Sequence, residues 1–224
     1  MNTIKIDTLG NEFLIEICHH ENELPEIKKL DDSIFNAHQG ISNELLLAIF
    51  KQGGLLVYKI NNQIVGESQV LFESAAGQSI ENKQTALFYG TAVLPAFRGH
   101  RIGEALALAQ EKLAITKGKT RAILSVRPEN ATSISLRLKM GFKIISWEAD
   151  YYGSGRLMME KWLTPKPIET TKPTGKVIQS VTIKIGDEID ISARKQLTIL
   201  FERDLKLTAY RLINSAKAIL EFSE

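Results

Sequence analysis

The sequence has 224 residues, which is enough for one ordinary domain with an appendage and a sizeable hydrophobic core. Its 28 Lys and Arg nearly balance its 26 Asp and Glu, so the charge indicates neither a nucleic-acid-binding nor a membrane-binding protein. Cys18, the single cysteine, excludes a disulfide framework, and no apolar run reaches transmembrane length, so we expect a soluble cytoplasmic protein.

The front half of the chain predicts elements that would build the acceptor side of a site. We expect a strand over Glu12 to Cys18, helices over Leu24 to Phe35 and Ser42 to Phe50, and strands over Gly54 to Ile60 and Gln63 to Phe72. Asn61 and Asn62 suit a two-residue turn, which predicts an antiparallel hairpin. The second hairpin strand carries Glu67 and Glu73 on one face, together with Val65, Gln69 and Leu71.

The central stretch predicts a strand, a basic turn and a helix. Ala86 to Leu94 is rich in apolar and aromatic residues and stops at Pro95, and an amphipathic helix begins at Ile102. Between them lies the turn Arg98-Gly99-His100-Arg101-Ile102-Gly103. The free N–H groups and the dipole at a helix start attract anions, glycines allow close approach, and arginines suit phosphate oxygens. The turn therefore predicts a diphosphate site, and the plainer alternative is a strand-to-helix turn with solvated arginines.

The rest of the chain predicts the end of a domain, a linker and an extension. We expect a strand over Thr120 to Val126, a helix over Thr132 to Met140, and strands over Gly141 to Trp147 and Arg156 to Leu163. Proline, threonine and lysine fill residues 165–176, which predicts a linker between a domain at 1–164 and an extension at 177–224. The extension reads as a strand followed by one long helix from Ser192 to Phe222. Because it is too small to bury a core alone, it should pack on the domain or on a second copy in a homodimer.

Two blocks of sequence carry a family resemblance. The first is the basic turn after Val93-Leu94-Pro95, and the second runs from Asn130 to Phe142 and includes Lys139 and Gly141. Over Phe13 to Leu163 the chain resembles the GNAT superfamily of N-acetyltransferases. The resemblance implies a mixed α/β (α+β) fold, with a central, mostly antiparallel sheet that contains one parallel splayed pair and is flanked by helices. The chain departs from the family pattern at Arg101, where a glycine is usual, and at Arg137, where a general-acid tyrosine is frequent.

The resemblance implies an acyl-CoA-dependent N-acyltransferase. The donor would be acetyl-CoA or a longer acyl-CoA, and the acceptor a primary amine on a small molecule or on a peptide lysine or ornithine. Backbone groups of Thr91, Ala92 and Val93 would polarise the acyl carbonyl, and the basic turn would hold the diphosphate together with Asn130 and Lys139. No histidine spacing indicates a metal site.

The catalytic groups are less clearly marked in the sequence. Phe88 and Tyr89 stand where the family often has a glutamate base, so Tyr89 is a catalytic candidate by its position. The alternative candidates for the base are Glu67, Glu73 and His38. For the leaving thiolate, Arg137 would stabilise the charge, Tyr151 or Tyr152 would donate a proton, or no acid is needed because a thiol pKa is about 8.5. The plainer alternative for Arg137 is a helix-surface arginine near the CoA phosphates. Since the usual base and acid are both missing, the alternative is a CoA-binding regulatory protein without catalysis.

Overall fold

The computed structural model describes residues 13–35, 40–151, 153–164, 176–186 and 190–223. The pattern of internal contacts divides the chain into two compact units, residues 1–122 and residues 123–224. His38, Tyr152 and all but the last residue of the expected 165–176 linker lie outside the described residues. None of the described helices is long and apolar enough to cross a membrane.

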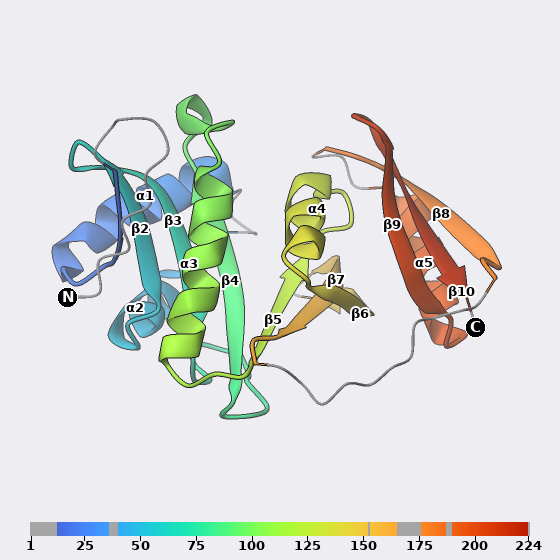
Figure 1. The fold of residues 1–224 in the computed structure, drawn as a ribbon, viewed down its shortest axis with the longest axis horizontal. Helices are drawn as coiled ribbons and strands as arrows, with labels where there is room; N and C mark the ends of the chain where they lie inside the picture. Colours follow the sequence, from blue (N-terminus) through green and yellow to red (C-terminus); the bar gives the residue numbers. More distant parts are fainter. Residues whose placement is uncertain (1–12, 36–39, 152, 165–175, 187–189, 224) are drawn as a thin grey trace. The chain divides into compact units, whose positions relative to one another are not determined.

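The order of elements up to residue 162 is the one that the sequence predicts (Figure 1). The elements are β1 (Phe13–Ile17), η1 (Glu21–Glu23), α1 (Leu24–Ile34), α2 (Asn43–Lys51), β2 (Leu55–Ile60), β3 (Gln63–Leu71), β4 (Thr85–Val93), η2 (Pro95–Phe97), α3 (Ile102–Thr116), β5 (Arg121–Val126), α4 (Ala131–Lys139), β6 (Lys143–Tyr151) and β7 (Ser154–Trp162). The strands follow the hydrogen-bonded order β1-β2-β3-β4-β5-β7-β6, mostly antiparallel with the parallel pair β4–β5. The expected mixed α/β fold class is confirmed.

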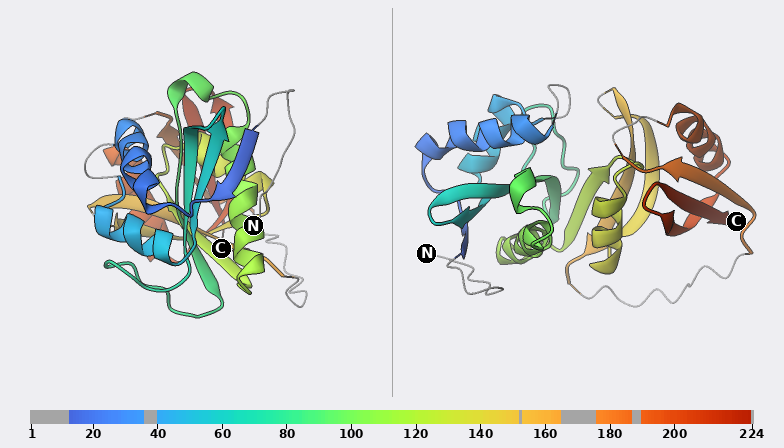
Figure 2. Two further views of the ribbon diagram at one scale, coloured as in Figure 1. Left: turned by 90° about the vertical axis from the view of Figure 1, so that its left-hand side faces the viewer. Right: turned by 90° about the horizontal axis from the view of Figure 1, so that it is seen from above.

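The first unit is a sheet with helices on both faces. Asn61 and Asn62 have φ values of 49° and 63°, which is the geometry of the tight hairpin turn predicted between β2 and β3. Helices α1 and α2 lie on one face of the strands and α3 on the other (Figure 2). The fully buried side chains of this unit include Ile15, Ile27, Ile49, Leu55, Leu56, Leu71, Phe88 and Leu106. All three helices contact β3.

A bulge interrupts β4 where it pairs with β3. Val70 pairs with Phe88 and Ser68 pairs with Thr91, so Tyr89 and Gly90 together oppose the single residue Gln69. The carbonyl oxygen of Gly90 accepts hydrogen bonds from Ser68 Oγ at 2.9 Å and Thr91 Oγ1 at 2.8 Å. Those bonds hold the bulge in place directly before Thr91.

The second unit ends in a small sheet instead of the expected long helix. Helix α5 (Ile191–Glu202) is followed by the hairpin β9 (Lys206–Asn214) and β10 (Lys217–Ser223), and β8 (Gln179–Lys184) completes the three-stranded order β8-β10-β9. The prediction of one helix from Ser192 to Phe222 is therefore wrong. The helix stops because Asp204 adopts a left-handed φ of 57° and Leu205 N–H bonds back to the carbonyl of Leu200.

The apolar face of α5 is covered within its own unit. Ala193, Leu197 and Leu200 on α5 are buried, as are Val181, Ile183, Ala218, Leu220 and Phe222 on the strands. The ring of Phe201 meets that of Phe222 edge to face, with centroids 5.4 Å apart. Helix α5 also packs against β6. Strand β10 reads as part of a helix because its buried residues are evenly spaced, but their period is two and not 3.6.

Candidate active site

The turn that opens α3 has the backbone geometry of an anion site. Arg101 is the N-cap residue with a left-handed φ of 60°, and its side chain makes no capping hydrogen bond to the helix. Gly99 is left-handed as well, at 83°. Residues 98–101 are exposed. The first-turn N–H groups of α3 therefore have no side-chain cap, and the positive end of the helix dipole faces outward.

The two arginines of the turn have different contacts. Arg98 Nε donates to the carbonyl of Val93 at 3.2 Å, which ties the turn to the end of β4. Arg101 donates from Nε and Nη2 to the carboxylate of Glu104, at 2.8 Å and 3.0 Å. Nδ1 of the exposed His100 lies 3.0 Å from the carbonyl oxygen of Arg98. Arg101 thus shapes the turn through its backbone, while its guanidinium pairs with the helix that it precedes.

The space in front of the turn is open. A Cβ placed on Gly99 or on Gly103 would meet no other atom within 4 Å. Ile102, between them in space and sequence, is buried against the sheet. The expected site residues Gly99, Ile102 and Gly103 therefore lie together at one accessible helix start.

The register of β3 and β4 brings Glu67 to the strand expected to hold the acyl group. Glu67 pairs with Ala92, Ser68 with Thr91, and Gly66 with Val93. Ser68 Oγ and Thr91 Oγ1 are 2.6 Å apart. Tyr89 is half-buried in the bulge, and Glu73 is exposed beyond the end of β3. Of the two candidate glutamates, only Glu67 lies beside Thr91–Val93.

Glu67 occupies a closed polar cluster. Its side chain is fully buried, and Gln69 Nε2 donates to its Oε2 at 2.8 Å. Burial, and next the nearby charge of Asp31, raise the pKa of Glu67 well above its usual range, against the opposing hydrogen bond from Gln69. Asp31 on α1 is buried too, and its Oδ2 accepts the backbone N–H of Ile41 at 2.8 Å. Burial raises the pKa of Asp31 as well.

Sequence reasoning missed Asp31 and gave Gln69 no role. Asp31 stands beside Asp32 and so resembles a solvent-facing carboxylate. However, it follows Ile27 by one helical turn on the buried face of α1. That spacing is the signal that would have found it.

The second sequence block, from Asn130 to Phe142, forms α4 and the turn that follows it. Asn130 is its N-cap, and its side-chain oxygen accepts from Ser133 N–H at 3.1 Å. Arg137 is only 6 % exposed, and its guanidinium carbon lies 5.4 Å from the centre of the Phe142 ring. Lys139 is exposed. Arg137 is therefore a buried cation packed on an aromatic ring and not a surface arginine.

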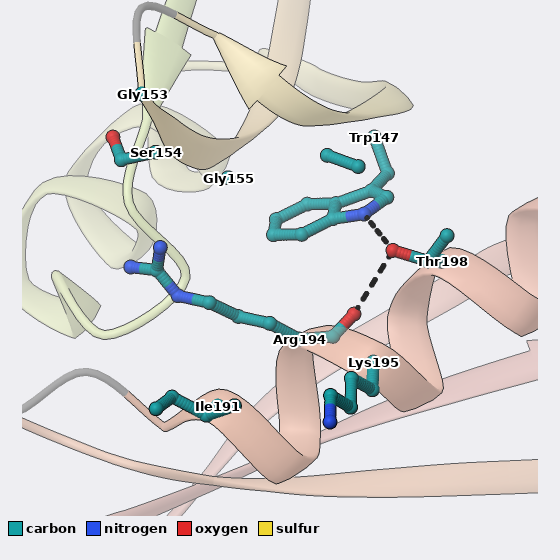
Figure 3. Close-up of a pocket in the computed structure, with 9 residues that line it drawn as sticks. Trp147, Gly153, Ser154, Gly155, Ile191, Arg194, Lys195 and Thr198 are labelled. Carbon is teal, nitrogen blue, oxygen red and sulfur yellow. Dashed lines mark hydrogen bonds between the residues drawn. The ribbon is translucent and has the colours of Figure 1, made fainter.

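The second unit also contains a shallow pocket that the sequence does not predict. It measures about 330 Å³ and is lined by Trp147, Ala149, Gly153, Ser154, Gly155, Ile191, Arg194, Lys195 and Thr198. Figure 3 shows the indole of Trp147 along one wall and the Arg194 side chain extending towards Ser154. Trp147 Nε1 donates to Thr198 Oγ1 at 2.9 Å, and that hydroxyl donates to the carbonyl of Arg194 at 3.1 Å. The first of these bonds fastens α5 to β6, and the second lies within α5.

Comparison with known proteins decides the family. The model of the acetyltransferase (GNAT) family matches residues 19–142, which is more than half of the chain. The chain belongs to the GNAT acetyltransferase family. The match includes the turn at α3 and the whole of α4, and it ends before the three-stranded sheet of this GNAT protein.

Solved structures share the GNAT fold at low sequence identity. Ard1 from Thermoplasma volcanium is 20 % identical with a TM-score of 0.58, and the match covers 68 % of this chain and 99 % of that one. The ribosomal-protein-S18-alanine N-acetyltransferase from Escherichia coli is 16 % identical with a TM-score of 0.55, covering 72 % and 99 %. YncA, a putative acetyltransferase from Salmonella typhimurium with its cofactor acetyl-CoA, is 18 % identical with a TM-score of 0.57, covering 70 % and 98 %. The comparison with curated proteins found no match.

Proposed function

We propose that this GNAT protein transfers an acyl group, from acetyl-CoA in the first instance, to a primary amine. The observation that carries the proposal is the open, uncapped start of α3 in a chain whose family is that of acetyltransferases. The solved relative YncA was crystallised with acetyl-CoA, which supports the same donor here.

The donor would bind through its diphosphate at the turn. The N–H groups from Ile102 onward supply hydrogen bonds, and the helix dipole favours the negative charge. Gly99 and Gly103 leave room for the phosphates, because a Cβ at either position would contact nothing. Arg98 adds a charge beside the turn, with Asn130 and Lys139 as further candidate contacts from α4. The backbone of Thr91, Ala92 and Val93 would then receive the acyl carbonyl.

Two side chains are proposed for the chemistry itself. An amine with a pKa of about 10.4 must lose a proton before it attacks, and Glu67 would accept that proton through water. Because its pKa is raised, Glu67 is a stronger base than an exposed glutamate. Arg137, a buried cation, would stabilise the departing thiolate. Tyr89 stays a candidate by its place at the bulge, next to Thr91.

The acceptor class is a primary amine on a small molecule or on a peptide. The structure of the NatC complex was solved with a Gag peptide and CoA, and it covers 68 % of this chain at 18 % identity. This relative favours a peptide amine, and a longer acyl-CoA is the alternative donor.

The deciding experiment follows thiol release from acetyl-CoA with a library of primary amines and lysine peptides. The protein adds little background to a thiol reagent, since burial raises the pKa of Cys18 to about 12. Release that depends on an amine, with the acylated amine found by mass spectrometry, supports the proposal. Glu67→Gln is the matched variant, and its rate should fall by about a hundredfold, as for removal of a general base.

A CoA-binding protein without catalysis is the second candidate. The complete burial of Glu67 favours it, because a closed side chain cannot touch an amine directly. Calorimetry with CoA separates the two candidates: tight binding with no turnover of any library amine would select the second.

A further inference from the structure

Two buried oxygen atoms beside the proposed acyl strand lack a hydrogen-bond donor. They are Oε1 of Glu67 and Oε1 of Gln69, and neither has a partner among the described residues. Both side chains are completely closed to solvent. The other ends of the same two groups are bonded to each other, because Gln69 Nε2 donates to Glu67 Oε2 at 2.8 Å. Unsatisfied polar atoms at such depth are rare and costly, so this pair requires an explanation.

One proton would satisfy both oxygens. A protonated carboxyl group is a donor as well as an acceptor, and a primary amide offers both functions side by side. With a proton on Oε1 of Glu67, a second hydrogen bond to Oε1 of Gln69 would run parallel to the bond that Gln69 Nε2 donates to Glu67 Oε2. The position of that proton is therefore defined by groups that the fold already holds.

The charged surroundings of the pair come from α1. Among the described residues, Asp31 is the charged group that acts on Glu67, and it also interacts with Gln69. Lys28 and Asp32 of the same helix lie near Asp31 and form an ion pair with each other. The neighbouring strands present Val57 and Ala92 opposite Glu67, and α3 presents Gln110, whose Nε2 donates to the carbonyl of Gln69 at 2.9 Å.

We infer that Asp31 and Gln69 are positioning residues for proton transfer to Glu67, an inference that rests on the proposed function. Gln69 fixes the carboxyl group and accepts the hydrogen bond of the incoming proton, while the negative charge of Asp31 favours the proton-loaded state. The backbone N–H of Ile41 holds Asp31 in place at 2.8 Å.

The proton balance of the reaction follows from this arrangement. The ammonium group of the acceptor gives one proton through water to Oε1 of Glu67. The proton stays on Glu67 and forms a hydrogen bond to Oε1 of Gln69. The amine nitrogen attacks the thioester carbonyl, so that a C–N bond forms and the C–S bond breaks. The thiolate takes the second proton from nitrogen, and Glu67 returns its proton to solvent before the next turnover.

The test measures the carboxyl group directly and then the reaction. Infrared difference spectra against pH are recorded for the wild type, and Glu67→Gln identifies the carboxylic acid C=O band that belongs to Glu67. Asp31→Asn keeps an acceptor for Ile41 N–H but removes the charge, so the band should titrate about one pH unit lower. Asp32→Asn, one residue away and largely exposed, is the matched control and should leave the midpoint unchanged. Gln69→Met should shift the frequency of the band, because both hydrogen bonds are lost.

The reaction provides the second readout. The pH dependence of kcat is measured with acetyl-CoA and the library amine that gives the highest rate. In Asp31→Asn the acidic limb of this pH profile should move to lower pH together with the infrared midpoint. An unchanged midpoint in Asp31→Asn overturns the role of Asp31, and an unchanged band in Gln69→Met overturns that of Gln69. If the infrared midpoint moves while the acidic limb of the pH profile of kcat does not, the role of Glu67 in proton transfer is overturned. If no amine is turned over, the proposed function fails, whereas the infrared titration still reports whether Asp31 and Gln69 control Glu67.

Discussion

Single residues at the start of α3 shape the site that we propose for the diphosphate of the donor. The carbonyl end of β4 is linked to the turn by Arg98, and Arg101 contributes a left-handed backbone with its guanidinium held by Glu104. The positive potential at the turn therefore comes from the backbone amides, the helix dipole and Arg98. Gly103 is the most sensitive position of the proposed phosphate site, because a side chain there would enter the space proposed for the ligand.

Gly103→Glu is expected to weaken acetyl-CoA binding by on the order of tenfold or more, since a carboxylate would face the diphosphate. Gly103→Gln is the control of equal size and should weaken binding less. Neither variant should change the thermal midpoint of the free protein by more than about 2 °C, because a Cβ at this position meets nothing within 4 Å. Isothermal titration calorimetry measures the first effect and calorimetric unfolding the second. Equal affinity in Gly103→Glu and the wild type would count against the phosphate site.

Glu67 should also make the stability of the protein depend on pH. A carboxyl whose pKa is raised on folding binds its proton more tightly in the folded state. Its contribution is therefore complete below the unfolded pKa of about 4.3 and is lost as pH rises through the folded pKa. Over that range the free energy of unfolding should fall by about 1.4 kcal/mol per pH unit in the wild type. Glu67→Gln should reduce this slope in urea titrations, leaving the part that comes from Asp31, whose pKa is raised as well. Parallel curves for the two proteins would contradict the prediction.

At the level of elements, a buried ion pair joins α5 to the segment before α4. Arg194 Nε and Nη2 donate to the two carboxylate oxygens of Glu129, at 2.9 Å and 3.0 Å, and the Glu129 side chain is 2 % exposed. The N–H of Asp190, the N-cap of α5, also points to Glu129 Oε1 at 3.3 Å. Because Glu129 directly precedes Asn130, this pair connects the C-terminal sheet to the start of α4.

Arg194→Met should destabilise the protein by about 3 kcal/mol, because it leaves a buried carboxylate without its partner. The double variant with Glu129→Gln should regain part of that loss, since the buried charge is then absent as well. The adjacent, exposed Lys195 supplies the control: Lys195→Met should change the free energy of unfolding by less than about 0.5 kcal/mol. Chemical denaturation of the wild type, Arg194→Met, Glu129→Gln and the double variant completes a double-mutant cycle, and Lys195→Met is measured beside them. A loss in Arg194→Met as small as that in Lys195→Met would mean that the pair contributes nothing to the fold.

The sequence predicted elements wherever local chemistry determines them. Asn61-Asn62 prefers the left-handed backbone of a tight turn, and the pattern from Ile102 to Leu113 marks one helical face. The prediction of a helix over residues 192–222 was wrong because tertiary contacts determine the structure there. Val181 on β8 and Leu220 on β10 face α5, and this non-local pairing favours a hairpin over a continued helix.

For the whole molecule, the parts of the site that depend on local sequence were predicted, and the parts that depend on tertiary packing were not. The turn at α3 was predicted because its geometry depends on a few consecutive residues. The helix α4 was predicted from Thr132, but the role of Asn130 as its N-cap was not. The burial of Asp31 beside Glu67 and Gln69 depends on the packing of α1 against β3. No single stretch of the sequence predicts that packing. The burial of Arg137 likewise comes from the Phe142 ring that folds back beneath α4.

Donor binding at the start of α3 is expected to stabilise the whole protein. Saturation with CoA at about a hundred times its Kd should add about 2.7 kcal/mol to the free energy of unfolding. Hydrogen exchange should then slow in the first turn of α3, whose N–H groups are the proposed contacts of the diphosphate. At the same CoA concentration Gly103→Glu should reduce both effects. Exchange in the first turn of α3 that CoA leaves unchanged would contradict the phosphate site, because a ligand held by those N–H groups must slow their exchange.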